Sequence, residues 1–406
     1  MRSGMDDTVS ASQVYDLAGG ILRHNLRLVD RGYKCTVQSL LLVLFLAASR
    51  AGSIFDACRR LRNAPTDQAI RNALVVQLPK AMKELERRLN LALQAKLPKG
   101  LLCQSRPLAI DTSEICYYGQ PWKNKRELRR GKRKAGTTRF HCYATLCVMR
   151  RGERFTVALT YVWATDSHVE VVKRLLEQAR QIGLRPRYLL LDRGFYGMDV
   201  VQYLKSIRCP FLMPVVHRGR RSKRPLSELK GTRRFLAWKR SGFATHVMKN
   251  QEQQTTVRIC VACRSKRKDG KPRPRPLVFA FWGFRPRSAA WAAEAYRKRY
   301  GIEASYRQMN QGRTRTCSRD PHLRLLLVGI ALVLRNVWVW LHRTVLGRVR
   351  GRGIELHLGS LRLRTMLLML QRCAEAWLGI TEAATYDPIT PRLPAMPSQG
   401  WNTWNY

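Results

Sequence analysis

Two aspartates stand where a carboxylate could be used for chemistry. Asp111 lies inside the apolar run 107–115, and Asp192 ends the run 186–191, directly before the turn Arg-Gly-Phe-Tyr-Gly. A buried carboxylate is costly unless a cation or hydrogen bonds compensate it, and a strand that ends at a glycine turn can project its side chain into a crevice. The pair therefore predicts a metal site, although an N-cap or an ion pair with arginine would explain either residue alone.

A third carboxylate follows in the segment YRKRYGIEASYRQMN. Tyr296, Arg299 and Glu303 are spaced Y-x2-R-x3-E, which on one helix puts all three on one face. That face would offer a carboxylate to a metal, a guanidinium for bidentate contact with a phosphate, and a phenol for a further phosphate contact. A solvated charged helix is the alternative.

The charge of the chain points to a polyanionic partner. Among 406 residues, 75 Lys and Arg stand against 27 Asp and Glu, a net charge of +48. Such an excess destabilises a compact chain unless a polyanion neutralises it. Because the basic residues are spread over the whole chain, nucleic acid is the favoured partner and an anionic membrane surface the second.

The first hundred residues are predicted to be helical. Periodic segments at 53–63 and 68–78 flank a break at Pro65, with Thr66 or Asp67 as the N-cap of the second. This pattern fits a helix-turn-helix that binds DNA, and it fits two helices of a bundle equally well.

Residues 107–216 are predicted to form, in order, a strand, a hairpin, a helix, a strand, a helix and a strand, with a long basic loop at 122–139 between the first strand and the hairpin. This order predicts an α/β fold with an RNase-H-like core. The domains are expected to be arranged as follows: helical 1–100, core 101–216, a β-rich insertion 217–287 with strand-like runs at 234–238, 245–249, 255–261 and 277–282, a second part of the core 288–350, and a C-terminal helix and tail 351–406.

Two apolar runs, 40–48 and 325–334, are shorter than the ~20 residues that span a bilayer. Both are therefore expected to be buried helices. With no evident signal peptide, a cytoplasmic protein without a membrane partner is expected. The 11 cysteines are irregularly spaced, and the Cys260-x-x-Cys263 pair lacks a second ligand pair, which favours buried thiols over zinc.

These motifs together resemble the DDE transposases of insertion sequences, in the group named for a Y-R-E-K signature. The resemblance spans about residues 105–345 and rests on LAIDTSEICYYG around Asp111, LLLDRGFYG with Asp192, and Tyr296-Arg299-Glu303. The run GTTRFHCYATLCV resembles the archaeal-type branch of that group. One position departs from the signature, because Asn310 stands where its final lysine is expected; Arg307 or Arg313 could supply the missing charge.

The resemblance implies a cut-and-paste transposase. Asp111, Asp192 and Glu303 would be the catalytic residues and the ligands of two Mg²⁺ or Mn²⁺ ions about 3.5–4 Å apart. The partner would be double-stranded DNA, bound by a homodimer at the nucleoid, with Tyr296, Arg299 and Arg307 as DNA contacts and the basic segments 123–139, 218–224 and 264–275 on phosphates. Cleavage through a hairpin would stack a flipped base on Trp282, with Trp238 and Trp291 as rivals and a core role as the alternative for Trp282.

Two other functions fit the same residues. A metal-dependent nuclease would use the same carboxylates without strand transfer. A catalytically inactive DNA-binding relative would keep the basic surface, and Asn310 is the feature in its favour.

Overall fold

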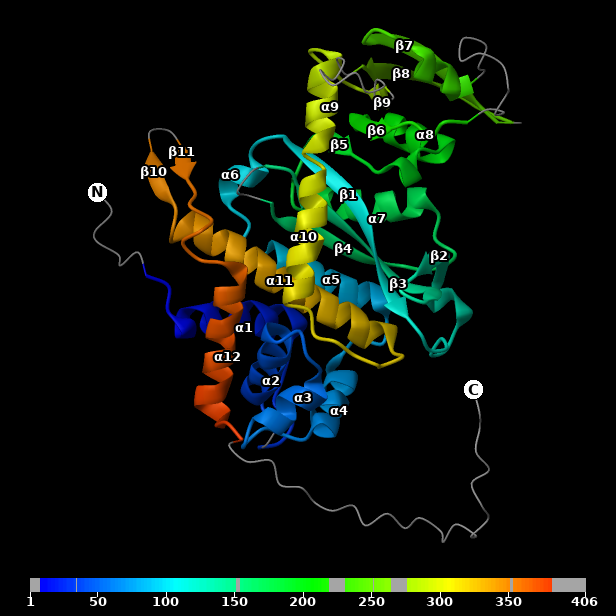
Figure 1. Ribbon diagram of the computed structural model, residues 1–406. Helices are drawn as coiled ribbons and strands as arrows, with labels where there is room; N and C mark the ends of the chain where they lie inside the picture. The colour runs from blue at the N-terminus through cyan, green and yellow to red at the C-terminus, as the bar shows by residue number, and fades with distance from the viewer. Residues whose placement is uncertain are drawn as a thin grey trace, which may run out of the picture.

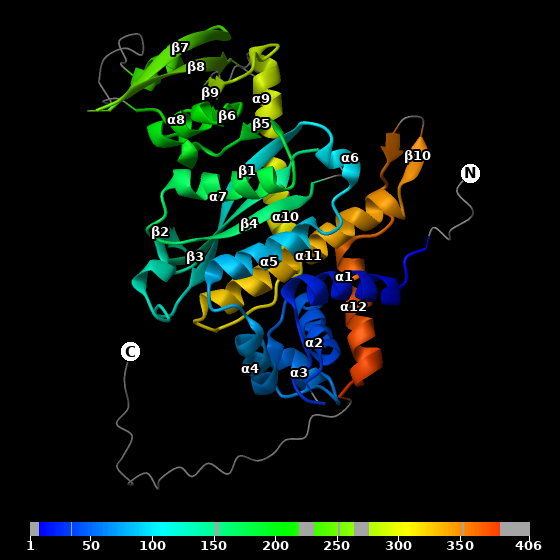
Figure 2. The ribbon, with the colours of Figure 1, turned by 180° about the vertical axis from the view of Figure 1, so that it is seen from behind.

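The computed structural model describes residues 8–33, 35–150, 154–218, 231–250, 252–263, 276–350 and 353–381. Most of the expected basic segments 218–224 and 264–275, and the C-terminal tail from 382, lie outside these residues. The chain forms a mixed α/β fold in which helices cover a single large mixed sheet, with a helical layer below it in Figure 1 and the same layers seen from behind in Figure 2.

The sheet has nine strands in the order β2-β3-β1-β5-β6-β9-β8-β7, with β4 also paired to β3. The antiparallel set β1, β3 and β4 is joined to a parallel set through β1, β5 and β6. The strands are β1 (Arg106–Tyr117), β2 (Arg129–Lys134), β3 (Thr137–Val148), β4 (Thr156–Val162), β5 (Pro186–Leu190), β6 (Phe211–Pro214), β7 (Gly242–Lys249), β8 (Gln254–Ala262) and β9 (Leu277–Trp282).

The strands expected as an insertion extend this same sheet. β9 pairs with β6, and β8 and β7 follow outward from it. The expected strand at 234–238 is wrong: Gly231–Ala237 is a 3-10 helix, which begins where the Thr232 hydroxyl accepts from the Arg218 amide and donates to the Val216 carbonyl. The expected loop at 122–139 is also corrected, because it contains edge strand β2.

Helices pack on both faces of the sheet and continue below it. They are α1 (Ala11–Leu26), α2 (Val37–Ser49), α3 (Ile54–Arg60), α4 (Asp67–Gln77), α5 (Met82–Gln94), α6 (Lys99–Leu102), α7 (His168–Gln181), α8 (Met198–Ser206), α9 (Ala289–Arg297), α10 (Tyr300–Gln311), α11 (Pro321–Thr344) and α12 (Leu363–Leu378). A small hairpin, β10 (Arg348–Arg350) with β11 (Gly353–Glu355), follows α11. The N-cap of α4 is Thr66, one of the two residues, Thr66 and Asp67, that were expected in this position.

Helix α11 lies between the sheet and the lower helices. It has 24 residues, longer than the apolar run expected from the sequence, and its length and composition would allow it to cross a membrane; however, 94% of its most apolar window is buried inside the protein. The expectation of a buried helix is confirmed. Buried Asn336 ties α11 to β4, since its amide oxygen accepts from the Thr156 N–H at 3.0 Å and its nitrogen donates to the Thr156 carbonyl at 2.7 Å.

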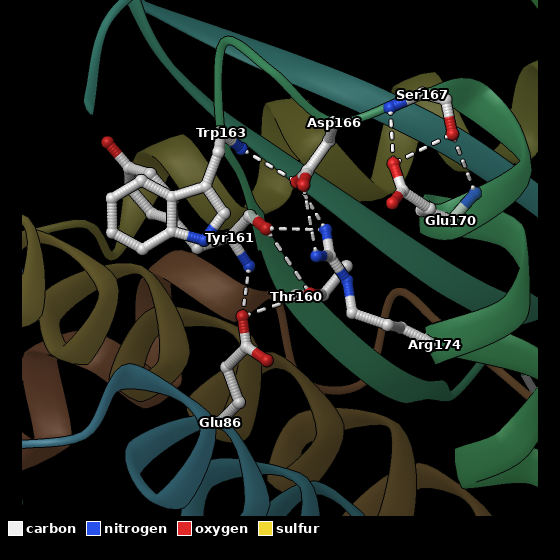
Figure 3. Close-up of polar contacts among 8 residues, drawn as sticks. All are labelled: Glu86, Thr160, Tyr161, Trp163, Asp166, Ser167, Glu170 and Arg174. Atoms are coloured by element: carbon white, nitrogen blue, oxygen red, sulfur yellow. Dashed lines mark hydrogen bonds and ion pairs between the residues drawn. The ribbon is translucent and has the colours of Figure 1, made fainter. Parts of the chain in front are cut away.

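The open edge of β4 is covered by polar side chains of α5. Asn90 accepts from the Leu159 N–H at 2.7 Å and donates to its carbonyl at 3.1 Å. Gln94 donates to the Val157 carbonyl, and Glu86 accepts from the Tyr161 N–H (Figure 3). Steps of four on a helix and of two on a strand are both about 6–7 Å, so one helix face matches one strand edge.

The end of β4 is fastened in the same way. Arg174 of α7 bonds both the Tyr161 carbonyl and the Asp166 carboxylate, and that carboxylate also accepts from the Trp163 N–H (Figure 3). Unpaired strand edges are templates for aggregation. These contacts close the edge and join the first hundred residues to the sheet.

We predict that Asn90→Ala lowers the free energy of unfolding by about 2–4 kcal/mol, because it leaves both backbone groups of Leu159 buried without a partner. Urea unfolding measures it. Leu91→Ala, on the exposed side of the same helix, is the matched control and should change stability by less than about 0.5 kcal/mol. A loss below about 1 kcal/mol for Asn90→Ala would contradict the edge-covering role.

Candidate active site

Strand register brings Asp111 and Asp192 to the same level of the sheet. In the parallel pair of β1 with β5, Ala109 lies opposite Leu190. Asp111 follows Ala109 by two residues within β1, and Asp192 follows Leu190 by two residues in extended backbone just beyond the end of β5, which places the two side chains at about the same level of one sheet face. Asp111 is buried, and Asp192 is half-exposed as the N-cap of the short helix that starts the glycine turn.

The third carboxylate comes from the junction of two helices. The expected single helix is corrected, because α9 ends at Arg297 and α10 begins at Tyr300. The Arg299 amide bonds the Tyr296 carbonyl and its own carbonyl accepts from Ile302, both three residues apart, which tightens the junction to a 3-10 turn. Glu303 lies in the first turn of α10, where the helix dipole favours a negative charge.

All three carboxylates meet at the guanidinium of Arg299. Its Nη1 lies 3.2 Å from Asp111 Oδ2, and its Nη2 lies 3.1 Å from Glu303 Oε1 and 4.0 Å from Asp192 Oδ1. The Arg299 side chain is only 7% exposed. Side chains from β1, the end of β5 and α10 therefore converge on one buried cation.

Burial and the neighbouring charges shift the pKa values of the ionisable groups in this site. Burial raises the pKa of Asp111 to about 6, although Arg299 and the Thr112 N–H act to lower it. Burial by itself would lower the pKa of Arg299, but Tyr296 and the three carboxylates raise it overall. Burial also raises the pKa of Tyr296, so its phenol stays neutral.

Tyr306 holds α10 against β1 at the position of Asp111. Its hydroxyl donates to the Asp111 carbonyl at 2.8 Å, and the Thr145 hydroxyl, 2.7 Å away, is left to donate to Tyr306. Thr145 lies opposite Asp111 in the pairing of β1 with β3. This link was not predicted from the sequence; the signal for it is that Tyr306 lies three residues after Glu303, on the neighbouring face of the helix.

A cleft of about 400 Å³ opens beside Asp192 and Arg299. Tyr296 and Tyr300 also line it, and the Tyr300 ring is more than half exposed. The guanidinium carbon of Arg299 lies 5.4 Å from the Tyr296 ring centre and 5.7 Å from that of Tyr300. A phosphate in this cleft would meet both the Arg299 guanidinium and the Asp192 carboxylate.

The donor set fits a divalent cation in its chemistry. Carboxylate oxygens are the ligands that Mg²⁺ prefers, and here three of them point at one monovalent cation. In the part of the chain that the structure describes, no three His, Cys, Asp or Glu side chains are close enough to hold a metal as they stand. The Arg299 guanidinium separates the three carboxylates, so Arg299 has to move before they can share an ion.

The other residues predicted on α10 lie along its exposed side. Arg307 follows Glu303 by four residues and Asn310 by seven, and all three are exposed. The Asn310 side-chain oxygen accepts from Arg313 Nε at 3.1 Å. An arginine therefore contacts the position at which the signature expects lysine.

The structure does not bring Trp282 to the carboxylates. Trp282 pairs with Phe211 at the start of β6, whereas the cleft beside Asp192 lies at the other end, where Pro214 pairs with Phe279. The partly buried Trp282 ring packs on the main core. Trp282 thus has the core position given above as its alternative, away from the cleft.

The two rival tryptophans also pack in the interior. Trp291 lies edge-on to Tyr188 and Phe284, and Trp238 lies edge-on to Phe235. Both are partly buried against the two hydrophobic clusters of the core.

Comparison with known proteins agrees with this fold. Residues 103–336 match the family model described as a transposase DDE domain. This chain therefore belongs to the DDE-domain transposases, a family of enzymes that cleave and join DNA strands in transposition and generally use divalent metal ions. The comparison with curated proteins gives no match.

A solved structure has the same overall fold. It is the cryo-EM structure of a piggyBac transposase synaptic complex with hairpin DNA, similar at 9% identity with a TM-score of 0.54 over 91% of this chain and 81% of that chain. At that identity, the similarity concerns the fold alone.

We predict a specific pH dependence for the metal-free protein. The folded state binds the Asp111 proton more tightly than the unfolded chain, because the pKa of Asp111 is about 6 instead of 3.8. Its contribution to stability is therefore full below about pH 4 and falls by up to about 3 kcal/mol as the pH rises through 6. Urea unfolding in EDTA at pH 4 and 7.5 should show this loss in the wild type and not in Asp111→Asn. Equal pH dependence in both proteins would contradict the assignment.

Proposed function

We propose that this chain is the transposase of an insertion sequence of the Y-R-E-K signature group, with Asp111, Asp192 and Glu303 as catalytic residues on an RNase-H-like core. The observation that carries the proposal is the convergence of these three carboxylates on the guanidinium of Arg299. The antiparallel β1, β3 and β4 joined to parallel β5 and β6 support the RNase-H-like assignment.

In this proposal the three carboxylates hold two Mg²⁺ or Mn²⁺ ions. Bound there, the ions would activate water or a DNA 3′-hydroxyl as nucleophile and stabilise the leaving oxygen. Asp111 and Asp192 are held at one level by the register of β1 with β5. Tyr306 sets the distance of Glu303 from Asp111 by tying α10 to the backbone of β1.

Arg299 would then exchange partners. Without metal, the Arg299 guanidinium neutralises the carboxylates; once the carboxylates held metal, the guanidinium would be free to turn toward the cleft that it lines. A DNA phosphate in the cleft would be its new partner, through a bidentate contact. Metal binding and DNA binding are therefore coupled through one side chain.

Double-stranded transposon ends and target DNA are the proposed partners, bound by a homodimer at the nucleoid. Cleavage through a hairpin remains part of the proposal on the strength of the sequence resemblance. With Trp282 in the core, the exposed Tyr300 ring beside Arg299 is the better candidate to stack on a flipped base.

A catalytically inactive DNA-binding relative is the second candidate, favoured by Asn310. The contact of Arg313 with Asn310 weighs against this candidate, because it supplies a cation at the position where the signature has lysine. A nuclease without strand transfer would share the site, and joining of a cleaved end to a second duplex separates it from a transposase.

We predict that Asp192→Asn or Glu303→Gln reduces DNA cleavage at least 1000-fold while DNA binding is kept, because each removes a charged metal ligand without removing a basic residue. The test is cleavage in Mg²⁺ of a plasmid that carries the coding region with its flanking DNA. Glu294→Gln, an exposed carboxylate on α9 paired with Lys298, is the matched control and should retain activity. Cleavage near the wild-type rate by either site variant means that the catalytic residues are misassigned.

We also predict that Arg299→Gln binds Mn²⁺ more tightly than the wild type in the absence of DNA, by about tenfold or ~1.4 kcal/mol, because a competing cation is removed from the carboxylates. Titration calorimetry measures the affinity. Lys298→Gln, the exposed neighbour, is the control and should leave it unchanged. Weaker Mn²⁺ binding by Arg299→Gln would show that the arginine preorganises the ligands instead of competing with the ion.

A further inference from the structure

The hairpin of β2 and β3 is a strongly basic surface that the catalytic site does not use. Its outer strand and turn expose Arg130, Lys132, Arg133 and Lys134. The loop before it adds exposed Lys123, Lys125 and Arg126.

The one acid within residues 123–139 forms no ion pair with these cations, and Glu114 of β1 is the acid that lies beside Gly131 of the ribbon. Glu127 is buried, and its carboxylate accepts hydrogen bonds from the backbone N–H groups of Trp122, Lys123 and Asn124. It therefore shapes the loop and forms no ion pair there with the exposed cations. A patch of one sign raises the local concentration of a polyanion.

The hairpin is held in a defined shape. Ala135 and Gly136 both have positive φ angles, 45° and 84°, as two-residue turns that follow the twist of a hairpin require. The Tyr118 hydroxyl donates to the Ala135 carbonyl, and Arg139 donates to the Gly119 carbonyl and the Gln120 side chain. The cations are therefore presented on a braced ribbon.

The ribbon lies at a distance from the carboxylates that one DNA duplex would span. Asp111 is opposite Thr145, and the turn of the hairpin begins eight residues away on β3, at Thr137. At about 3.4 Å per residue this is about 27 Å, or about eight base pairs of duplex. Figure 1 shows β1 running from below the junction of α9 and α10 toward β2 and β3.

We propose that the β2–β3 ribbon is a DNA clamp that grips the phosphate backbone of the duplex within one helical turn of the cleavage site. This rests on the proposed function, since the distance is measured from the carboxylates. Beyond the pair of Tyr117 with Arg139, where β1 ends, the ribbon has two strands and is narrow enough to lie along a DNA groove. Contacts from Lys and Arg to phosphates position the duplex without reading its sequence. Two exposed aromatic rings extend the same surface: Tyr118 beside the turn of the ribbon and Trp122 in the loop before it.

The basic residues of β2 have another explanation. Charged side chains on an edge strand prevent it from pairing with a second copy of the chain. In that case their removal would cause self-association, and the affinity of the monomer for DNA would not change.

The test compares two triple variants of the full chain. Lys132→Ala with Arg133→Ala and Lys134→Ala removes three exposed cations from the ribbon. Lys96→Ala with Lys99→Ala and Arg185→Ala removes three exposed cations near the start of β1, at its other end. The net charge falls by the same amount in both, so a general charge effect cancels.

Binding to a 32-base-pair duplex of mixed sequence is measured in EDTA at several salt concentrations. For the ribbon variant, we expect the slope of log affinity against log salt to fall by about 2 to 3, at about 0.9 per lost phosphate contact. The control variant should lose less than one. Equal slopes in the two variants, or self-association of the ribbon variant with unchanged DNA affinity of its monomer, would overturn the clamp.

A cleavage measurement separates this proposal from the proposed function. On a plasmid carrying the coding region and its flanking DNA, the ribbon variant should need at least fivefold more protein than the control variant for half-maximal cleavage. If the wild type cleaves nothing, the proposed function fails while the salt slopes still decide the clamp. If the ribbon variant cleaves at the control's protein concentration, the clamp is wrong and the proposed function stands.

Discussion

Three carboxylates that meet on one side of a sheet repel one another, and the arrangement of this protein depends on the cation placed between them. Arg299 contacts Asp111, Asp192 and Glu303 with its two terminal nitrogens while it is itself almost fully buried. A buried ion pair is stable only when its partners are well matched. Here one guanidinium serves three acids, so the metal-free protein can keep the site assembled, and the same contact ties release of the carboxylates to movement of the arginine.

The surrounding elements bring these groups together and hold them there. Register between β1 and β5 aligns the two aspartates, and the tight junction of α9 with α10 places Arg299 and Glu303 over them. Tyr306 fastens α10 to the backbone of β1. Below, α11 lies between sheet and helices, and α5 covers the edge of β4 with side-chain hydrogen bonds, so the strand set that carries Asp111 is supported along its open side.

The net charge of +48 has a spatial organisation that its magnitude does not reveal. Arg299 is enclosed in the site, and other arginines, such as Arg174 and Arg335, donate to backbone carbonyl groups within the fold. A group of lysines and arginines is exposed on the β2–β3 hairpin. Exposed cations such as those of the hairpin can contribute to long-range attraction of DNA. The division explains how a strongly basic chain can fold compactly and still present a cationic surface to its substrate.

The sequence by itself determined the elements that carry the site and the residue types within them. Asp111 in an apolar strand, Asp192 before its glycine turn and the spacing of Tyr296, Arg299 and Glu303 are local patterns, and periodicity and polarity are local properties. Only the tertiary structure decided the pairing partners: the alignment of the aspartates, the contact of Tyr306, the continuation of the sheet through β9, and the separation of Trp282 from the cleft. Strand β2 was not predicted because its sequence, RRGKRK, has no apolar face. It is a strand because its backbone pairs with β3, a contact that its own residues do not reveal. Such contacts depend on register and packing between distant segments, which no spacing along one segment encodes.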